Sequence, residues 1–135
     1  MLSLIEIFSI IFIHWFADFV LQTNKQAQGK SKNWRDLLAH TFTYSLSWYL
    51  VIFCFAVCGN HFNGLSREDL GWSPWMLLFP FITFIAHTAT DYFTSRLNSK
   101  LWSKGDVHNF FVSVGFDQVL HYIQLFLTYY LLKTA

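Results

Sequence analysis

Residues 4–21 read LIEIFSIIFIHWFADFVL, a stretch apolar enough to cross a bilayer that nevertheless contains His14 and Asp18. A helix crosses the bilayer core with about 20 mostly apolar residues, and an ionised carboxylate at that depth costs roughly 2.5–3.5 kcal/mol. Residues four positions apart lie on the same face of a helix, so the two polar groups point in one direction. The stretch therefore predicts a membrane-spanning helix with one polar, functional face.

Three further stretches of the chain are similarly long and apolar. Short polar segments that contain glycine separate them, and antiparallel helices joined by short loops form an up-and-down bundle. The 135 residues have room for a single domain. We therefore expect an all-α polytopic membrane protein, one domain over residues 1–135, with four transmembrane helices at about 2–21, 37–58, 75–93 and 110–132.

The composition supports this class and excludes several others. Charged residues make up 13% of the chain, whereas a soluble domain has about 25%. The formal net charge of +1 leaves no face that is basic throughout, so we expect membrane lipids as surroundings and no nucleic-acid partner. The two cysteines do not form a Cys-x-x-Cys pattern, and no serine-hydrolase or nucleotide-binding motif is present.

The distribution of basic residues predicts the orientation. Cytoplasmic loops of membrane proteins carry an excess of Lys and Arg. The first and third loops hold seven of the nine basic residues, and only Arg67 and Lys133 lie on the opposite side. We expect loops one and three in the cytoplasm and both termini outside.

A short internal similarity suggests a duplicated helix pair. The sequence HWFADFVLQ at residues 14–22 is similar to HTATDYFTS at residues 87–95, and a basic loop follows each. The bundle would then contain two parallel helix-pair repeats, related by an axis along the membrane normal.

The polar residues within the four expected spans should meet at one level. At 1.5 Å per residue, counting from the cytoplasmic ends places all of them roughly 6–17 Å into the membrane. Because consecutive helices run in opposite directions, this agreement does not follow from the sequence order. The residues are His14, Asp18, His40, His87, Asp91, Asp117 and His121.

Imidazole and carboxylate groups in this number suggest a metal centre. Both are ligands for zinc, manganese or iron(II), and a catalytic zinc takes about three protein ligands. Seven groups exceed one such site, so we expect one or two divalent ions, with neutral histidines and with Asp18 or His40 as a catalytic base. The expected metal ligands are His14, Asp18, His87, Asp91, Asp117 and His121.

Two other interpretations use the same residues. A histidine in a membrane helix is often a hydrogen-bond partner that holds two helices together. Chains of Asp and His also form proton or ion pathways. The residues alone leave these alternatives open.

Longer motifs in the chain resemble a known family. They are HWFADFVLQ from His14, LLAH ending at His40, HTATDY from His87, and FFVSVGFDQVLH ending at His121. Together they resemble small bacterial and phage membrane proteins that are classed as a domain of unknown function. The resemblance implies a multi-pass protein of the bacterial inner membrane and carries no activity. More distantly, the HxxxD helices are similar to those of proteins described as membrane-bound metal-dependent hydrolases, although the loops differ.

These observations lead to two functional hypotheses. The first is a metal-dependent hydrolase that acts at the cytoplasmic leaflet on a lipid-linked ester or phosphoester, with a metal-bound water as nucleophile. The second is a non-enzymatic membrane protein, either an ion or proton conductor or a partner of an envelope protein. Four helices make a thin bundle, so a homodimer that encloses the polar cluster is a further expectation.

Overall fold

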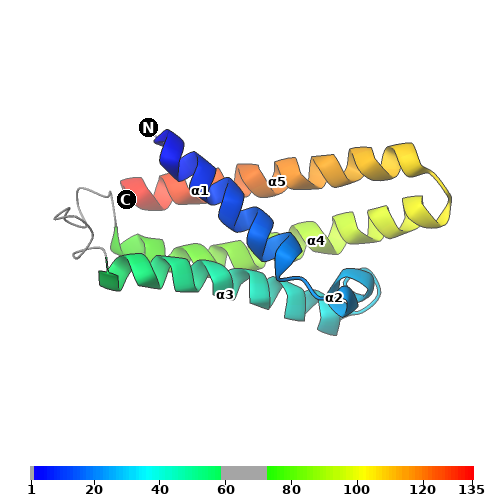
Figure 1. Ribbon diagram of the computed structural model, residues 1–135, viewed down its shortest axis with the longest axis horizontal. Coiled ribbons are helices and arrows are strands. Elements are labelled where there is room, and N and C mark those ends of the chain that lie inside the picture. Colours follow the sequence, from blue (N-terminus) through cyan, green and yellow to red (C-terminus); the bar gives the residue numbers. More distant parts are fainter. Residues whose placement is uncertain (1, 59–72) are drawn as a thin grey trace.

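The computed structural model describes residues 2–58 and 73–135, which form helices and no strand (Figure 1). The first helix, α1 (Leu4–Trp15), starts with a capping box in which Ser3 and Glu6 bond each other's backbone N–H groups. It continues directly into a π-helical segment, η1 (Phe16–Val20).

Two short elements and three long helices follow. A short helix, α2 (Asn24–Gly29), also begins with a capping box. The long helices are α3 (Trp34–Cys58), α4 (Phe79–Ser103) and α5 (Val107–Thr134), and a 3₁₀ segment, η3 (Pro74–Leu78), leads into α4.

Glycine and proline sit where the backbone requires them between and within these elements. Pro80 lies in the first turn of α4, where a missing N–H removes no helical hydrogen bond. Gly105 has φ = 70° in the turn from α4 to α5, a conformation that favours glycine.

The long helices α3, α4 and α5 lie side by side, and α1 crosses them obliquely (Figure 1). Both termini lie at one end of the molecule, and α2 lies toward the other end, where the α4–α5 turn is found. Trp48 and Phe79 pack edge to face within the apolar core, with ring centroids 5.1 Å apart. Near the termini, Glu6 on α1 accepts hydrogen bonds from Tyr129 and Lys133 on α5, which fixes the upper part of α1.

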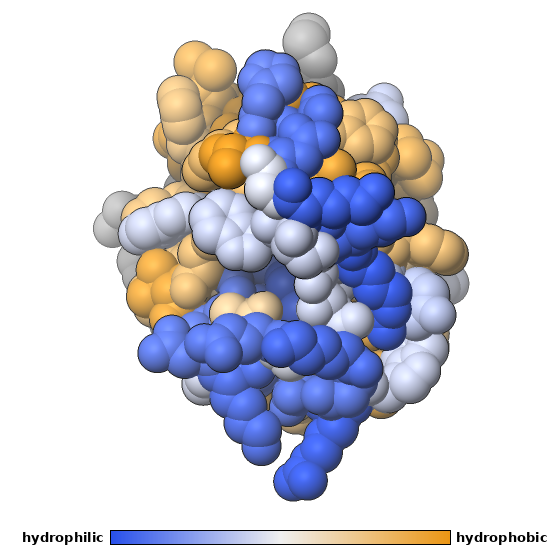
Figure 2. Space-filling view, turned by 90° about the vertical axis from the view of Figure 1, so that its right-hand side faces the viewer, coloured by the Kyte–Doolittle hydropathy of each residue, from blue (hydrophilic) through white to orange (hydrophobic). Residues whose placement is uncertain are grey.

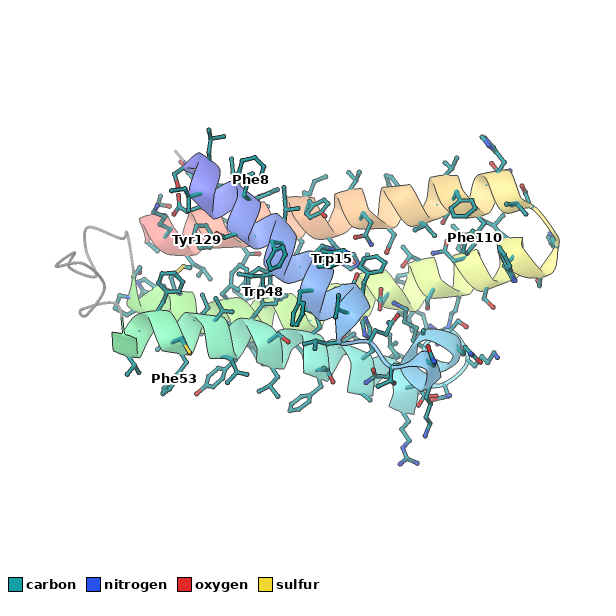
Figure 3. All side chains as sticks on the ribbon, viewed as in Figure 1. Phe8, Trp15, Trp48, Phe53, Phe110 and Tyr129 are labelled. Atoms are coloured by element: carbon teal, nitrogen blue, oxygen red, sulfur yellow. The ribbon has the colours of Figure 1, made fainter. Side chains whose placement is uncertain are left out.

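Within the described part of the chain, three helices are long and apolar enough to cross a membrane. They cover residues 34–57, 74–103 and 107–134, and they overlap the expected spans 37–58, 75–93 and 110–132. The remaining expected span, residues 2–21, is the first in the chain. It is divided between the twelve-residue α1 and the five-residue η1 and is not among the three helices that are long and apolar enough. Large apolar side chains such as Phe42, Phe81 and Phe116 are exposed on the outside of the bundle, as expected for helices in contact with lipid. In Figure 3, Phe53 points outward in the same way, whereas Trp48 points into the bundle.

Candidate metal centre

The polar residues of the expected cluster are all buried inside the helical bundle. Each lies on an inward-facing side of its helix, so the carboxylates and imidazoles face one another. The four histidines of the cluster are at most 1% exposed, and its three aspartates at most 8%. The buried residues are His14, Asp18, His40, His87, Asp91, Asp117 and His121.

Three of these residues form a nearly equilateral triangle of ligand atoms. Asp18 Oδ1 lies 3.0 Å from His40 Nε2 and 3.4 Å from His87 Nε2, and the two nitrogens are 3.2 Å apart. Three ligands with bonds of about 2.0 Å to a tetrahedral zinc would be about 3.3 Å from each other. The triangle therefore has the dimensions of one face of a tetrahedral metal site.

A second group of three shares His87 with the first. It consists of His87, Asp91 and His121, whose ligand atoms also lie within 4.8 Å of one another. His121 Nε2 is 3.6 Å from Asp91 Oδ1, and Asp91 Oδ2 is 3.2 Å from His40 Nε2 in the first group. The two groups are thus contiguous, and together they can hold one or two ions.

The π-helical segment aims Asp18 into this cluster. Its defining hydrogen bond runs from the N–H of Leu21 to the carbonyl of Phe16, five residues earlier. Such a segment adds a residue to one turn and changes which side chains face inward, and it is frequent at functional sites. Ala17 and Asp18 are the buried residues of the segment, with Asp18 pointing toward His40 and His87.

His14 lies beside the two groups and not within them. Its Nε2 is 2.9 Å from Oε1 of the Gln118 side chain, which can only accept, so Nε2 donates there. Its Nδ1 then accepts from the Tyr44 hydroxyl at 2.7 Å. Because both ring nitrogens have partners, and Asp18 is 3.9 Å away, the geometry places His14 as a support for the cluster.

Asp117 also stands at the edge of the cluster. Its Oδ1 lies 3.4 Å from His121 Nε2, one helical turn away, and its Oδ2 accepts a hydrogen bond from Gln118. Asp117 belongs to neither group of three among the described residues. In this position it lies beside the His121 ring.

Gln22 controls the proton on His40. The side-chain amide of Gln22 lies 3.1 Å from His40 Nδ1. With the amide nitrogen at that position, Nδ1 accepts and Nε2 carries the proton. Rotating the amide by a half-turn places its oxygen at Nδ1 and frees the Nε2 lone pair for a metal.

Two functional side chains were missed by sequence reasoning. Lys30 is one of the basic residues of the first loop that predict the orientation, yet its Nζ lies 3.0 Å from Asp91 Oδ2. Burial disfavours the Lys30 ammonium, but the carboxylates of Asp91 and Asp18 outweigh that cost and raise its pKa. Tyr44 stacks on His87, with ring centroids 3.9 Å apart. Tyr44 follows His40 by four residues, so helical spacing could have placed it on the same face. No local sequence pattern marks Lys30 as part of the site.

The chemistry of the cluster fits a bound cation. Three carboxylates face one Lys30 ammonium, so the cluster retains negative charge when its histidines are neutral. Asp18 Oδ1, Asp117 Oδ1 and His121 Nε2 are buried without a hydrogen-bond partner in the described ranges. Buried polar atoms normally have partners, so these atoms need one. Buried His and Asp groups of this kind can hold a divalent metal ion.

Comparison with known proteins identifies the family. No curated protein and no solved structure matches the chain, so the expected similarity to metal-dependent hydrolases has no match behind it. Over residues 7–135 the chain matches the model of the family described as protein of unknown function (DUF3307), and it therefore belongs to that family.

Proposed function

We propose that this chain is a multi-pass protein of the bacterial inner membrane whose buried His/Asp cluster binds one or two divalent ions. Three helices of sufficient length and apolar exterior support the membrane location. In this proposal two parts of the chain that carry seven of the nine basic residues face the cytoplasm, and both termini lie outside. The two parts are residues 24–35 around α2, and residues 96–104 at the end of α4 and in the turn after it. The first helix, α1 with η1, completes a four-helix transmembrane bundle.

The triangle of Asp18 Oδ1, His40 Nε2 and His87 Nε2 carries the metal assignment. Each separation of 3.0–3.4 Å alone is near a hydrogen-bond distance, but the three together match ligands around a common ion. A hydrogen bond between two helices needs only one donor and one acceptor. It does not require three ligand atoms at nearly equal distances from one another. Zinc, manganese and iron(II) all accept this set of nitrogen and oxygen ligands.

We assign the residues the following roles. Asp18, His40 and His87 hold one ion, and Asp91 and His121 hold a second or complete the coordination of the first. His14 and Asp117, which were expected as ligands, position the others. When bound, the ion supplies Lewis acidity and activates water. Asp91 acts as the general base when it does not coordinate an ion, whereas Asp18 and His40, the expected catalytic bases, are ligands in this assignment.

The reaction that this arrangement serves is hydrolysis of a lipid-linked ester or phosphoester at the cytoplasmic leaflet. The cluster lies on the α2 side of the bundle and next to Lys30, which is suited to an anionic substrate. A nucleophile generated there is shielded from bulk water by the helices. A lipid, in contrast, reaches the site by moving within the membrane.

Metal content and hydrolysis are tested together on the purified chain in detergent. We expect zinc, manganese or iron near one or two equivalents per chain, and cleavage of short-chain lipid esters or phosphoesters that stops when a chelator is added. Folded, metal-free protein would instead support a non-enzymatic role, in which the interhelical His–Asp contacts hold the bundle together. Metal-loaded protein with no activity on any lipid ester would contradict the hydrolase assignment and leave the metal site standing.

A further inference from the structure

A cavity opens beside the proposed metal centre, between two parts of the chain that are distant in sequence. Its volume is about 510 Å³, and it is lined by α2 and the turn after it on one side and by the ends of α4 and α5 on the other. Figure 2 looks onto this end of the molecule and shows hydrophilic residues above and below a recess. The volume lies within the range of about 300–1,000 Å³ that is usual for small-molecule sites.

One wall of the cavity is polar and positively charged. Lys30 and Lys32 line it, with no carboxylate among the lining residues described. Ser95 also lines it, and its Oγ is buried without a hydrogen-bond partner, in a side chain that is only 8% exposed. Oδ1 of Asn98, a half-buried residue, likewise has no hydrogen-bond partner among the described residues. Two cations and two unpartnered polar groups form a site for an anion that also carries a hydroxyl or amine donor.

The opposite wall of the cavity is aromatic. Trp102 and Phe110 pack against each other with ring centroids 5.0 Å apart, and Figure 3 shows Phe110 between α4 and α5. Trp102 is 60% exposed and Phe111 is 63% exposed, so this wall continues onto the apolar outside of the bundle. The ligand therefore has an anionic part and an apolar part that extends along this surface.

The cavity and the metal centre are connected along one face of α4. Ser95 follows Asp91 by four residues, and Asn98 and Trp102 continue the same face into the cavity. Lys30 belongs to both places, because its Nζ contacts Asp91 and its side chain lines the cavity. A group bound in the cavity thus lies next to the buried carboxylates.

We infer that this cavity binds the phosphate-bearing headgroup of a membrane lipid, with the phosphate at Lys30 and Lys32 and the acyl chains along Trp102 and Phe111. The inference rests on the proposed function in naming the substrate of the metal centre, although the binding itself needs no metal. Ser95 donates to a phosphate oxygen, and the Asn98 side-chain carbonyl accepts from a protonated oxygen of the same phosphate monoester. The phosphoester is then held beside Asp91.

Calorimetric titration of the full chain in detergent tests this inference with three probes. They are dioctanoyl phosphatidic acid, dioctanoylglycerol and inorganic phosphate. We expect the phosphatidic acid to bind at least about tenfold more tightly than either of the others, because only it contacts both walls. Equal binding of the phosphatidic acid and the neutral lipid would overturn the inference. Equal binding of inorganic phosphate would overturn the lipid assignment in favour of a free phosphate.

Two variants locate the binding in the cavity. Lys32→Gln should weaken phosphatidic acid binding roughly fivefold to tenfold, and Asn98→Leu should weaken it comparably. The matched control is Lys25→Gln, which removes the same charge from an exposed position of α2 outside the cavity. Equal effects of Lys25→Gln and Lys32→Gln would overturn the inference.

Metal content measured on the same samples separates this inference from the proposed function. Metal-loaded protein that does not bind phosphatidic acid would overturn the inference alone. Metal-free protein that binds it, with the Lys32→Gln effect intact, would support the cavity assignment and contradict only the metal-dependent function.

Discussion

Lys30 Nζ lies 3.0 Å from Asp91 Oδ2, although the two residues are 61 positions apart in the sequence. The same carboxylate oxygen is 3.2 Å from His40 Nε2, so the ammonium shares Asp91 with the proposed metal centre. In the metal-free chain Lys30 offsets part of the charge of the buried carboxylates. The ion pair therefore stabilises the fold and competes with a metal for one ligand.

This competition predicts opposite effects of Lys30→Gln on stability and on metal affinity. The free energy of unfolding of the metal-free protein should fall by about 2 kcal/mol, because Asp91 loses a partner that is mostly buried. The metal dissociation constant should fall about tenfold, because a positive charge near the ion is removed. Chelator competition and thermal unfolding measure the two effects. Lys25→Gln should change neither, and a Lys30→Gln variant with weaker metal binding would contradict the competition.

Gln22 should set metal affinity through His40. Gln22→Ala removes the group that fixes the tautomer of the His40 ring, so metal affinity should fall about 10- to 100-fold. Gln22→Glu, whose carboxylate accepts from Nδ1–H, should retain or increase the affinity. Titration of the apo protein with zinc under chelator competition gives both constants. If Gln22→Ala binds zinc as the wild type does, Gln22 does not set the His40 tautomer for metal binding.

A glycine near the cluster should tolerate no side chain. A Cβ at Gly29 would lie 1.9 Å from Oδ2 of Asp36, whose carboxylate accepts from Asn33 in the turn that carries Lys30. Gly29→Ala should therefore lower the free energy of unfolding by about 1–3 kcal/mol. Gly115→Ala is the control, because no atom lies within 4 Å of its Cβ position in α5, and it should leave stability unchanged or raise it by up to about 1 kcal/mol. Equal effects in chemical unfolding would show that the turn is not packed as described.

Tyr44 should matter for stability more than for metal stoichiometry. Tyr44→Phe removes the hydrogen bond to His14 and keeps the ring that stacks on His87. The free energy of unfolding should fall by about 1 kcal/mol, and the metal content should stay at its wild-type value. Loss of the metal in Tyr44→Phe would mean that His14 is itself a ligand and not a support.

Much of the architecture follows from the sequence because it depends on local periodicity and length. Long apolar stretches predicted four spans, and three of them are helices long and apolar enough to cross a membrane in the described part of the chain. The i, i+4 pairs predicted which faces would be polar. The first span differs in its local structure, because the π-helical segment at Phe16–Val20 cannot be read from hydropathy. The four-span membrane bundle, its orientation and the two repeats stay predictions.

The sequence predicted which His and Asp residues lie together in the candidate site. It did not predict which of their atoms contact one another. Shared depth indicated that the seven His and Asp residues would meet, but depth does not say which nitrogen or oxygen faces which. The different positions of His14 and Asp117 depend on Tyr44 and Gln118, partners supplied by other helices or by a neighbouring side chain. The Lys30–Asp91 contact is set by the path of the first loop, which has no sequence signature.

Elemental analysis of the purified chain beside His87→Ala is the most direct test of the account, because His87 is the one residue shared by both groups of ligand atoms in the described structure. His108→Ala, at an exposed histidine outside the cluster, is the matched control. The account predicts one or two equivalents of zinc, manganese or iron in the wild type and in His108→Ala, and a loss of most of that metal in His87→Ala. Folded wild-type protein without bound metal, or His87→Ala with an unchanged metal content, would contradict it.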